Sequence, residues 1–371
     1  MKEVVRRWHR RVAALVGWLA LAGCTPSAVR LPAEFEPTQT VLLAWRDYPE
    51  ELSFVASAAA QAGANVWVFD GPERLGPVPP GQYRALPLEV VSPWVRDYAP
   101  LVIERDGRAV VLAPRRAPGG GRGPPEDTVP CRVAEAMGLP CEPLDLLLEG
   151  GNLSSDGQGT LFTSVRTYEQ NAPLSPAEVD RRLRERLGAS RVIAFQPART
   201  ADGRPADGTG HLDMFFQLVA PCRALVAEST DEPFAAALEA VVAQLGRVPC
   251  AGGGTYRVDR VPGRFLDGVW SSFTNALLVN GTVVLPGFRG GDTMAAKRTF
   301  EQALPGATVV PVFVEGPLRA GGAVHCLTAN VPRIRRRQSS PGALALLGLV
   351  VVGGVGLAVA FALRRRLSSP R

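Results

Sequence analysis

Short strand pairs that turn at Asn-Gly or Asp-Gly recur along this chain, separated by single helical stretches. Residues 101–112 and 276–285 turn at Asp106-Gly107 and Asn280-Gly281, the strongest short-range signal for a β-hairpin. Residues 153–163 contain a third such turn, at Asp156-Gly157. Helices are predicted over residues 50–62, 128–138, 176–187, 231–245 and 293–303. This rhythm favours an α/β fold of repeated hairpin-and-helix units, about five of about sixty residues each, over one parallel sheet.

Other local signals complete the expected organisation. Residues 40–45 are an apolar run typical of a buried strand, and Ser175 before Pro176 is a start signal for the helix over 176–187. The Gly/Pro-rich residues 118–130 are predicted to be a flexible loop. No interdomain linker interrupts residues 30–332, which we expect to form one domain.

The first residues are typical of an export signal. Four arginines between positions 6 and 11 precede the apolar run from Val12 to Ala22. Leu21-Ala22-Gly23-Cys24 resembles the lipobox of bacterial lipoproteins, which implies lipidation of Cys24. The expected lipoprotein-type signal peptide covers residues 1–24. The alternative is an ordinary cleaved signal peptide in which the cysteine occurs by chance.

The last residues carry a second membrane signal. Residues 341–363 contain no charge and have the length of one transmembrane helix. They follow a basic linker over residues 333–340 and precede a basic tail over 364–371. A C-terminal sorting segment has the same layout. We therefore expect an extracytoplasmic body, tethered to membrane lipid at one or both ends.

The charge distribution excludes nucleic-acid binding by the body. Residues 1–29 and 333–371 together hold 13 basic and one acidic residue of the chain's 41 and 35. The remaining 28 basic and 34 acidic residues give residues 30–332 a net charge of −6. A nucleic-acid-binding body would concentrate Lys and Arg on its folded part. A mildly acidic body suits a small cationic substrate.

The six cysteines fall into three roles. Cys24 belongs to the export signal, and Cys326 is the candidate for chemistry. In an oxidising compartment the other four can form two disulfides, with three possible connectivities, among Cys131, Cys141, Cys222 and Cys250. Histidine occurs only at positions 9, 211 and 325, so no zinc or other metal site is predicted.

Several motifs follow one another between residues 34 and 332. They are Glu34-Phe35-Glu36-Pro37, Trp94-Val95-Arg96-Asp97-Tyr98-Ala99-Pro100, Glu149-Gly150-Gly151-Asn152 with Asp156-Gly157-Gln158-Gly159-Thr160, Gly210-His211-Leu212-Asp213-Met214, and Gly321-Gly322-Ala323-Val324-His325-Cys326-Leu327-Thr328. In type and order they resemble the motifs of agmatine deiminases and bacterial-type peptidylarginine deiminases. The resemblance implies a catalytic domain over 30–332 with the pentein fold, a five-bladed α/β-propeller of ββαβ-like units.

The residue types also suit hydrolysis of a guanidinium group. Its central carbon is delocalised and weakly electrophilic, so a strong soft nucleophile is needed, and a Cys326 thiolate is the best candidate. Asp97 and Asp213 can accept paired N–H groups from the planar cation. His211 can protonate the departing ammonia and then deprotonate water, and no cofactor is required.

Spacing favours His211 over His325 as the partner of Cys326. His211 and Asp213 are two residues apart, so on a strand both would point to the same face. His325 and Cys326 are adjacent and would point to opposite faces.

The resemblance adds further candidate residues for substrate binding. Glu149 lies near the site in the family, and Asn275 matches an active-site asparagine of the bacterial peptidyl enzymes. Trp94 is a candidate to stack on the guanidinium. Arg115 and Arg116 lie where those peptidyl enzymes use arginines to hold a carboxylate.

The substrate stays open among related guanidines. Agmatine, converted to N-carbamoylputrescine and ammonia, is the first expectation. Arginine or peptidyl-arginine, converted to citrulline at the cell envelope, is the alternative that Arg115 and Arg116 favour. An envelope-anchored binding protein without turnover is a third hypothesis, against which the complete Cys, His and Asp set argues. The oligomeric state is not predicted.

Overall fold

The structure is a computed structural model that describes residues 28–115 and 124–334. The expected signal peptide with Cys24, Arg116, and the apolar and basic C-terminal segments 341–363 and 364–371 lie outside the described residues. Of the expected basic linker, Arg333 and Ile334 are described. Within the described ranges, no helix has the length and apolar character needed to cross a membrane.

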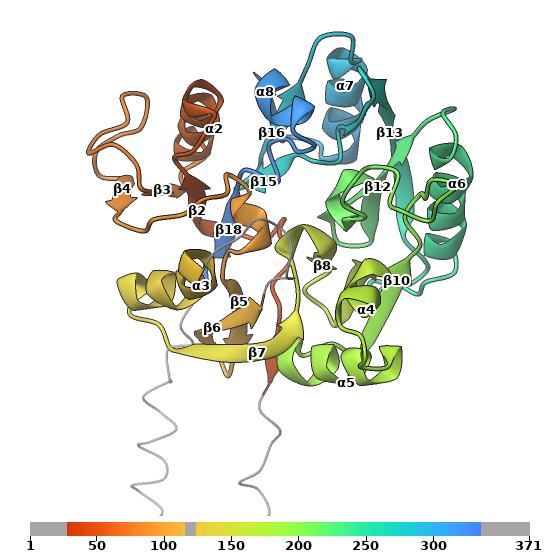
Figure 1. Ribbon diagram of the computed structural model, residues 1–371, viewed down its shortest axis with the longest axis horizontal. Coiled ribbons are helices and arrows are strands. Elements are labelled where there is room, and N and C mark those ends of the chain that lie inside the picture. The colour runs from red at the N-terminus through yellow and green to blue at the C-terminus, as the bar shows by residue number, and fades with distance from the viewer. Residues whose placement is uncertain (1–27, 116–123, 335–371) are drawn as a thin grey trace, which may run out of the picture. The chain divides into compact units, whose positions relative to one another are not determined.

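A recurring unit of two antiparallel strands, a helix and a third strand parallel to the second builds most of the fold (Figure 1). Across the described residues the strands form five separate sheets, which confirms the predicted mixed α/β class. The first sheet contains β1 (Val29–Arg30), β5 (Leu101–Arg105), β6 (Arg108–Arg115) and β7 (Cys141–Leu147). The second contains β8 (Leu153–Ser155), β9 (Thr160–Ser164) and β10 (Arg191–Phe195). The third contains β11 (Phe216–Ala220), β12 (Arg223–Glu228), β13 (Arg257–Leu266) and β14 (Val269–Ser272). The fourth contains β15 (Leu277–Val279), β16 (Thr282–Gly287) and β17 (Thr308–Phe313), and the fifth β2 (Thr38–Ala44), β3 (Asn65–Phe69), β4 (Tyr83–Leu86) and β18 (Ala329–Pro332).

The helices connect the second strand of each unit to its parallel third strand. They are α2 (Pro49–Gln61), α3 (Pro124–Met137), α4 (Arg166–Gln170), α5 (Pro176–Leu187), α6 (Phe234–Leu245) and α7 (Thr293–Ala303), with α8 (Glu315–Arg319) following β17. Such a crossover is required because a short turn can join only antiparallel strands. In Figure 1, α2, α5, α6 and α7 lie toward the periphery, while β5, β8, β15 and β18 lie nearer the middle.

The predicted hairpin turns are present. Asp106 and Gly107 have φ angles of 53° and 73° between β5 and β6, and Asn280 and Gly281 have 46° and 80° between β15 and β16. Two successive residues in the left-handed region match the right-handed twist of the strands. Asp and Asn tolerate this region and glycine enters it without strain, so these pairs fix the register of both hairpins.

Helix α5 shows how local sequence fixes an element's ends and its buried face. The Ser175 side chain accepts a hydrogen bond from the Glu178 backbone N–H, and Pro176 occupies the first helical position. The helix ends at Gly188, whose φ is 72°. Val179, Leu183 and Leu187 are buried at intervals of four residues, so one face packs against the core.

The last strand of the described chain pairs with a strand near its beginning. Strand β18 pairs antiparallel with β2, with Ala329 opposite Leu42. This pairing brings the turn that carries Cys326 next to the segment that leads into β2.

The prediction of a loop over residues 118–130 is wrong from Pro124 onward, because α3 begins at Pro124. Proline fits the first turn of a helix, where its missing N–H would have no partner. The Glu126 side chain in that turn also accepts hydrogen bonds from the backbone of Val91 and Ser92, 3.2 and 2.7 Å away. Composition could not reveal that tertiary support.

Two disulfides, Cys131–Cys141 and Cys222–Cys250, settle the open connectivity. The first joins α3 to β7 within one unit, and its partners are separated by 10 positions in the sequence. We expect the double variant Cys131→Ser/Cys141→Ser to lower the free energy of unfolding by about 3 kcal/mol, because the unfolded chain gains loop entropy. Urea unfolding of the oxidised wild type and the double variant measures this. An unchanged unfolding midpoint would contradict it.

Candidate active site

Short turns that precede the first strand of each unit meet at one buried site. The 3₁₀ turn η1 (Val95–Asp97) precedes β5, η2 (Gly150–Asn152) precedes β8, and η3 (Leu212–Met214) precedes β11. Phe273–Asn275 precede β15, and the turn over residues 324–327 precedes β18. Each unit therefore contributes side chains from an equivalent position.

Cys326 is a buried free cysteine, 8% exposed. Asn275 Nδ2 lies 3.1 Å from its Sγ, and Asn275 Oδ1 accepts from its backbone N–H at 3.3 Å. One carboxylate oxygen of Asp213 lies 3.7 Å from the same sulfur. The asparagine thus orients the thiol beside a carboxylate, and the structure brings together all three of these predicted residues.

The surroundings of Cys326 hold its thiol in the neutral form. Burial raises the pKa of Cys326 well above its ordinary value, and the charges of Asp213 and Asp97 raise it further. A cation placed between these carboxylates would offset their charge and favour the thiolate. Ionisation of Cys326 would therefore be easiest when a cation occupies the space between these two carboxylates.

His211 is buried between two acids. Its Nε2 lies 3.0 Å from Glu149 Oε2, and its Nδ1 lies 3.6 Å from Asp97 Oδ1. Burial lowers the pKa of His211, but the Asp97 charge and the Glu149 hydrogen bond outweigh it and raise the pKa to about 10. His211 is therefore protonated at neutral pH and can donate a proton. Gln170 Nε2 donates to the same Glu149 oxygen at 3.0 Å and holds it in place.

The local conformation around His211 differs from the predicted strand. His211 precedes the η3 turn with φ −75° and ψ 150°, and β11 begins only at Phe216. The alternation rule does not apply to such a turn. Asp213 nevertheless comes close to His211, because both side chains lie against Gly151.

The predicted opposite orientation of His325 and Cys326 is wrong. They lie in a turn, and both reach the Asp213 carboxylate, since His325 Nδ1 is 2.7 Å from the same Oδ2 that lies 3.7 Å from Cys326 Sγ. His325 therefore belongs to the site, and the residue that it contacts there is Asp213.

Glu34 and Arg96 are two further residues beside the site that the sequence did not identify as site residues. Glu34 Oε2 lies 2.8 Å from His325 Nε2, and Arg96 lies 3.6 Å from Glu34. Arg96 also receives support from the turn itself, since its backbone N–H donates to the Cys326 carbonyl at 3.2 Å. Glu34 and Arg96 each lie within one of the sequence motifs given above. A charged motif residue without an assigned role was therefore the sequence feature that could have pointed to them.

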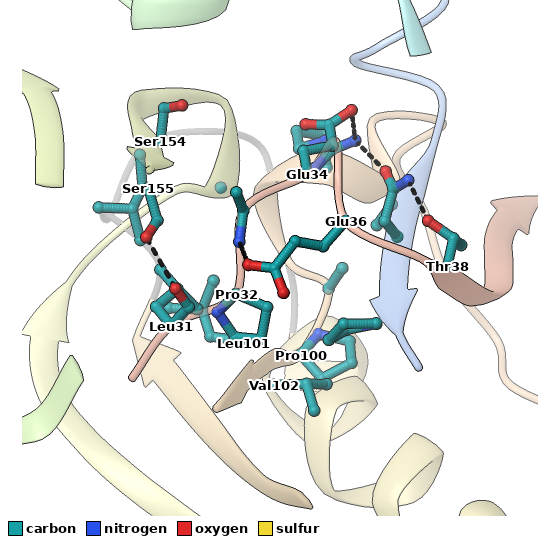
Figure 2. A pocket seen from close by; sticks show the side chains of 18 residues that line it. Leu31, Pro32, Glu34, Glu36, Thr38, Pro100, Leu101, Val102, Ser154 and Ser155 are labelled. Atoms are coloured by element: carbon teal, nitrogen blue, oxygen red, sulfur yellow. Dashed lines mark hydrogen bonds and ion pairs between the residues drawn. The ribbon is translucent and has the colours of Figure 1, made fainter. Parts of the chain in front are cut away.

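Glu34 also borders a hollow of about 90 Å³ next to the site. Figure 2 shows this hollow, with Glu34 and Glu36 on the segment that leads to Thr38 and Ser154 and Ser155 from β8. Glu36 is bonded to the Ala33 backbone N–H at 2.9 Å and to Arg30 at 2.7 Å rather than to the site.

Trp94 and the two arginines occupy different positions. Trp94 is half-buried and packs against the cluster that contains Cys326, and a methyl group on Gly322 would lie 2.5 Å from its ring. Arg115 is exposed at the end of β6, where its carbonyl accepts from Leu148 N–H at 3.0 Å, one residue before Glu149. Arg116 lies outside the described residues. Within residues 28–115 and 124–334, no group of three or more His, Cys, Asp or Glu is arranged to hold a metal ion.

Gly151 leaves the space in which the candidate catalytic side chains His211 and Asp213 meet. A methyl group at this position would lie 2.9 Å from His211 Nδ1 and 3.0 Å from Asp213 Oδ2. We expect Gly151→Ala to displace both side chains and lower kcat/KM by about 100-fold. The matched control is Gly76→Ala, because a methyl group there meets nothing within 4 Å. Steady-state kinetics and thermal unfolding of both variants test this, and equal activities would contradict it.

Comparisons with known proteins agree with this geometry. The sequence model of the Porphyromonas-type peptidyl-arginine deiminase family matches residues 30–332. The agmatine deiminase of Pseudomonas aeruginosa (strain LESB58) is 26% identical over 368 aligned residues, which cover 84% of this chain and 98% of that protein.

Solved structures share the fold. The agmatine deiminase of Enterococcus faecalis has a TM-score of 0.73 at 22% identity and covers 83% of this chain and 97% of its own. The C. jejuni agmatine deiminase has a TM-score of 0.69 at 18% identity, with 84% and 98% covered. These likenesses show that the chain shares the mixed α/β fold of those two proteins.

Proposed function

The chain belongs to the Porphyromonas-type peptidyl-arginine deiminase family, and from this premise we propose that it hydrolyses a guanidinium group through a covalent intermediate on Cys326. The observation that carries the proposal is the set of four side chains gathered at one buried site. Asp97, His211, Asp213 and Cys326 come from three separate turns, and each has the chemistry that one step requires.

The first half of the proposed cycle releases ammonia. The cationic substrate lies between Asp97 and Asp213, and its charge promotes loss of the Cys326 proton to solvent. The thiolate attacks the guanidinium carbon and forms a C–S bond. His211 donates its proton to the departing nitrogen, the C–N bond breaks, and an amidino-cysteine remains.

The second half uses water. Neutral His211 takes a proton from water, and the hydroxide attacks the amidino carbon. Collapse of this adduct breaks the C–S bond, releases the ureido product with loss of the hydroxyl proton, and restores the thiolate and protonated His211. The released ammonia takes up the proton to become ammonium.

Agmatine is the first substrate to test, because relatives that match over nearly their full length are named agmatine deiminases. Arginine or peptidyl-arginine is the second, and the description of the matching family favours it. Arg115 supports this second candidate. Its carbonyl accepts a hydrogen bond from Leu148, the residue before Glu149, so its backbone is held near the site while its side chain is exposed.

Ammonia release by the full chain from agmatine, free arginine and a peptide ending in arginine tests the proposal. Activity on agmatine supports the first candidate. Activity on the peptide that falls with Arg115→Ala supports the second. No release from any of the three would favour a binding protein without turnover.

We also propose that the five sheets form the blades of a propeller with residues 30–332 as the catalytic domain. The equivalent positions of the five site turns and the pairing of β18 with β2 support this arrangement. The export and membrane signals at both ends of the sequence support an extracytoplasmic, membrane-tethered enzyme. Fractionation of cells expressing the full chain tests this location, and recovery in the cytoplasm would contradict it.

A further inference from the structure

The buried His325 and the partly buried Glu34 form an ion pair beside the site, and the proposed cycle gives this pair no role. His325 is 4% exposed, and both of its ring nitrogens lie within hydrogen-bonding distance of a carboxylate. Nδ1 is 2.7 Å from Asp213 Oδ2, and Nε2 is 2.8 Å from Glu34 Oε2. A ring that donates at both nitrogens is an imidazolium, since a neutral imidazole donates only once.

The second oxygen of Asp213 completes the pattern. Asp213 Oδ1 is buried and has no hydrogen-bond partner among the described residues. A buried acceptor without a partner is unfavourable, so this oxygen is prepared to accept from a substrate N–H. One oxygen of the carboxylate is thus fixed by His325, and the other is left for the substrate.

The charges around Cys326 give His325 a second effect. Asp97, Glu149, Asp213 and Glu34 supply four negative charges to the network, and protonated His211, protonated His325 and Arg96 supply three positive ones. One cationic substrate then brings the network to neutrality. Without the charge on His325, the field opposing a thiolate at Cys326 would be stronger.

We propose that His325, held by Glu34, is a positioning residue that fixes Asp213 for the substrate and offsets negative charge beside the nucleophile. This inference rests on the proposed function and adds a residue to its site. The groups that face His325 are Asp213 from η3, Glu34 from the segment before β2, and Arg96 from η1.

Burial and the Arg96 charge lower the pKa of His325, but Glu34 and the Asp213 hydrogen bond outweigh them and raise it. Glu34 in turn stays ionised, because burial raises the pKa of its carboxyl but the charges of His325 and Arg96 lower it to about 2. The two groups therefore each favour the ionised form of the other.

Two substitutions of His325 separate its hydrogen bonds. The amide nitrogen of an asparagine can replace Nδ1 and keep the bond to Asp213, whereas that of a glutamine replaces Nε2 and keeps the bond to Glu34. We expect His325→Gln to lower kcat by about 100-fold with a smaller change in KM, and His325→Asn to lose less. Equal losses in the two variants would overturn the positioning of Asp213.

Glu34→Gln tests the charge without removing the acceptor. Loss of the Glu34 charge lowers the pKa of His325, so its proton dissociates at lower pH and the alkaline limb of the kcat/KM profile moves to lower pH. The matched control is Glu36→Gln, the same change in the same segment and beside the same hollow (Figure 2), bonded to Arg30 instead of the site. An unchanged limb in Glu34→Gln would overturn the proposal.

A readout without turnover distinguishes this inference from the proposed function. The rate at which iodoacetamide alkylates Cys326 in the full chain, followed by mass spectrometry of its peptide, reports the thiolate fraction at each pH. We expect the inflection point of the alkylation rate against pH to move to higher pH in His325→Gln and to stay unchanged in Glu36→Gln. If wild type releases no ammonia but this shift occurs, the proposed function fails and the effect of His325 on Cys326 stands. If no shift occurs, the inference fails whether or not the wild type is active.

Discussion

The variant Cys326→Ser is expected to lose ammonia release by at least about 10⁴-fold, because a hydroxyl at this position cannot form the nucleophile that a poorly electrophilic guanidinium carbon requires. The burial and the carboxylates that raise the pKa of the thiol would oppose ionisation of a serine even more strongly. Binding should survive, since Asp97 and Asp213 remain. The measurements are the initial rate of ammonia release and the dissociation constant for the best substrate.

A matched control for this variant is the pair Cys131→Ser/Cys141→Ser, which makes the same substitution away from the site. We expect it to lower stability but to keep kcat/KM within a few-fold of wild type. Mass spectrometry of wild type mixed with substrate should also show an amidino adduct on the Cys326 peptide that the variant lacks. Turnover by Cys326→Ser within about 100-fold of wild type would place the nucleophile elsewhere.

The variant His211→Ala is expected to lower kcat by about 10³-fold, because the same imidazole serves as acid in one half of the cycle and as base in the other. Its pKa of about 10 means that the wild type keeps the acid form through neutral pH and loses it as pH rises. The alkaline limb of the wild-type kcat/KM profile should therefore include His211 and change in the variant. Profiles between pH 6 and 11 for both proteins measure this.

The conservative variant His211→Gln distinguishes a role of His211 in proton transfer from a role in hydrogen bonding alone. Its amide can still donate to Glu149 but cannot transfer a proton at either half of the cycle, so we expect it to be as inactive as His211→Ala. Recovery of activity to within about tenfold of wild type in His211→Gln would reduce His211 to a binding role.

Parts of the fold whose causes lie within a few residues were predictable. The hairpins at Asp106-Gly107 and Asn280-Gly281 form as expected because Asp and Asn tolerate left-handed backbone and the glycine that follows adopts it without strain. Helix α5 has the expected start and end because its cap and its proline are adjacent in sequence. Helix α3 begins earlier than composition suggested, since its first turn is supported by residues 34 and 35 positions away.

The candidate site was likewise predictable in part. The motifs and the chemistry of the reaction identified Cys326, His211, Asp213 and Asp97 as candidates, and Asn275 was included by resemblance. Spacing on an assumed strand misplaced His325, because these residues lie in turns where alternation does not hold.

By itself, the sequence determined the mixed α/β class, the hairpin registers, the positions of most of the longer helices and the residue types of a guanidinium site. Only the tertiary structure decided the disulfide pairing and the contacts among His325, Glu34 and Asp213. Glu34 and His325 are 291 residues apart, and they meet because β18 pairs with β2 and brings the two ends of the fold together. The reason is that local backbone preferences act over a few residues, whereas the environment of a buried charge is set by whichever distant segments the completed sheets bring beside it.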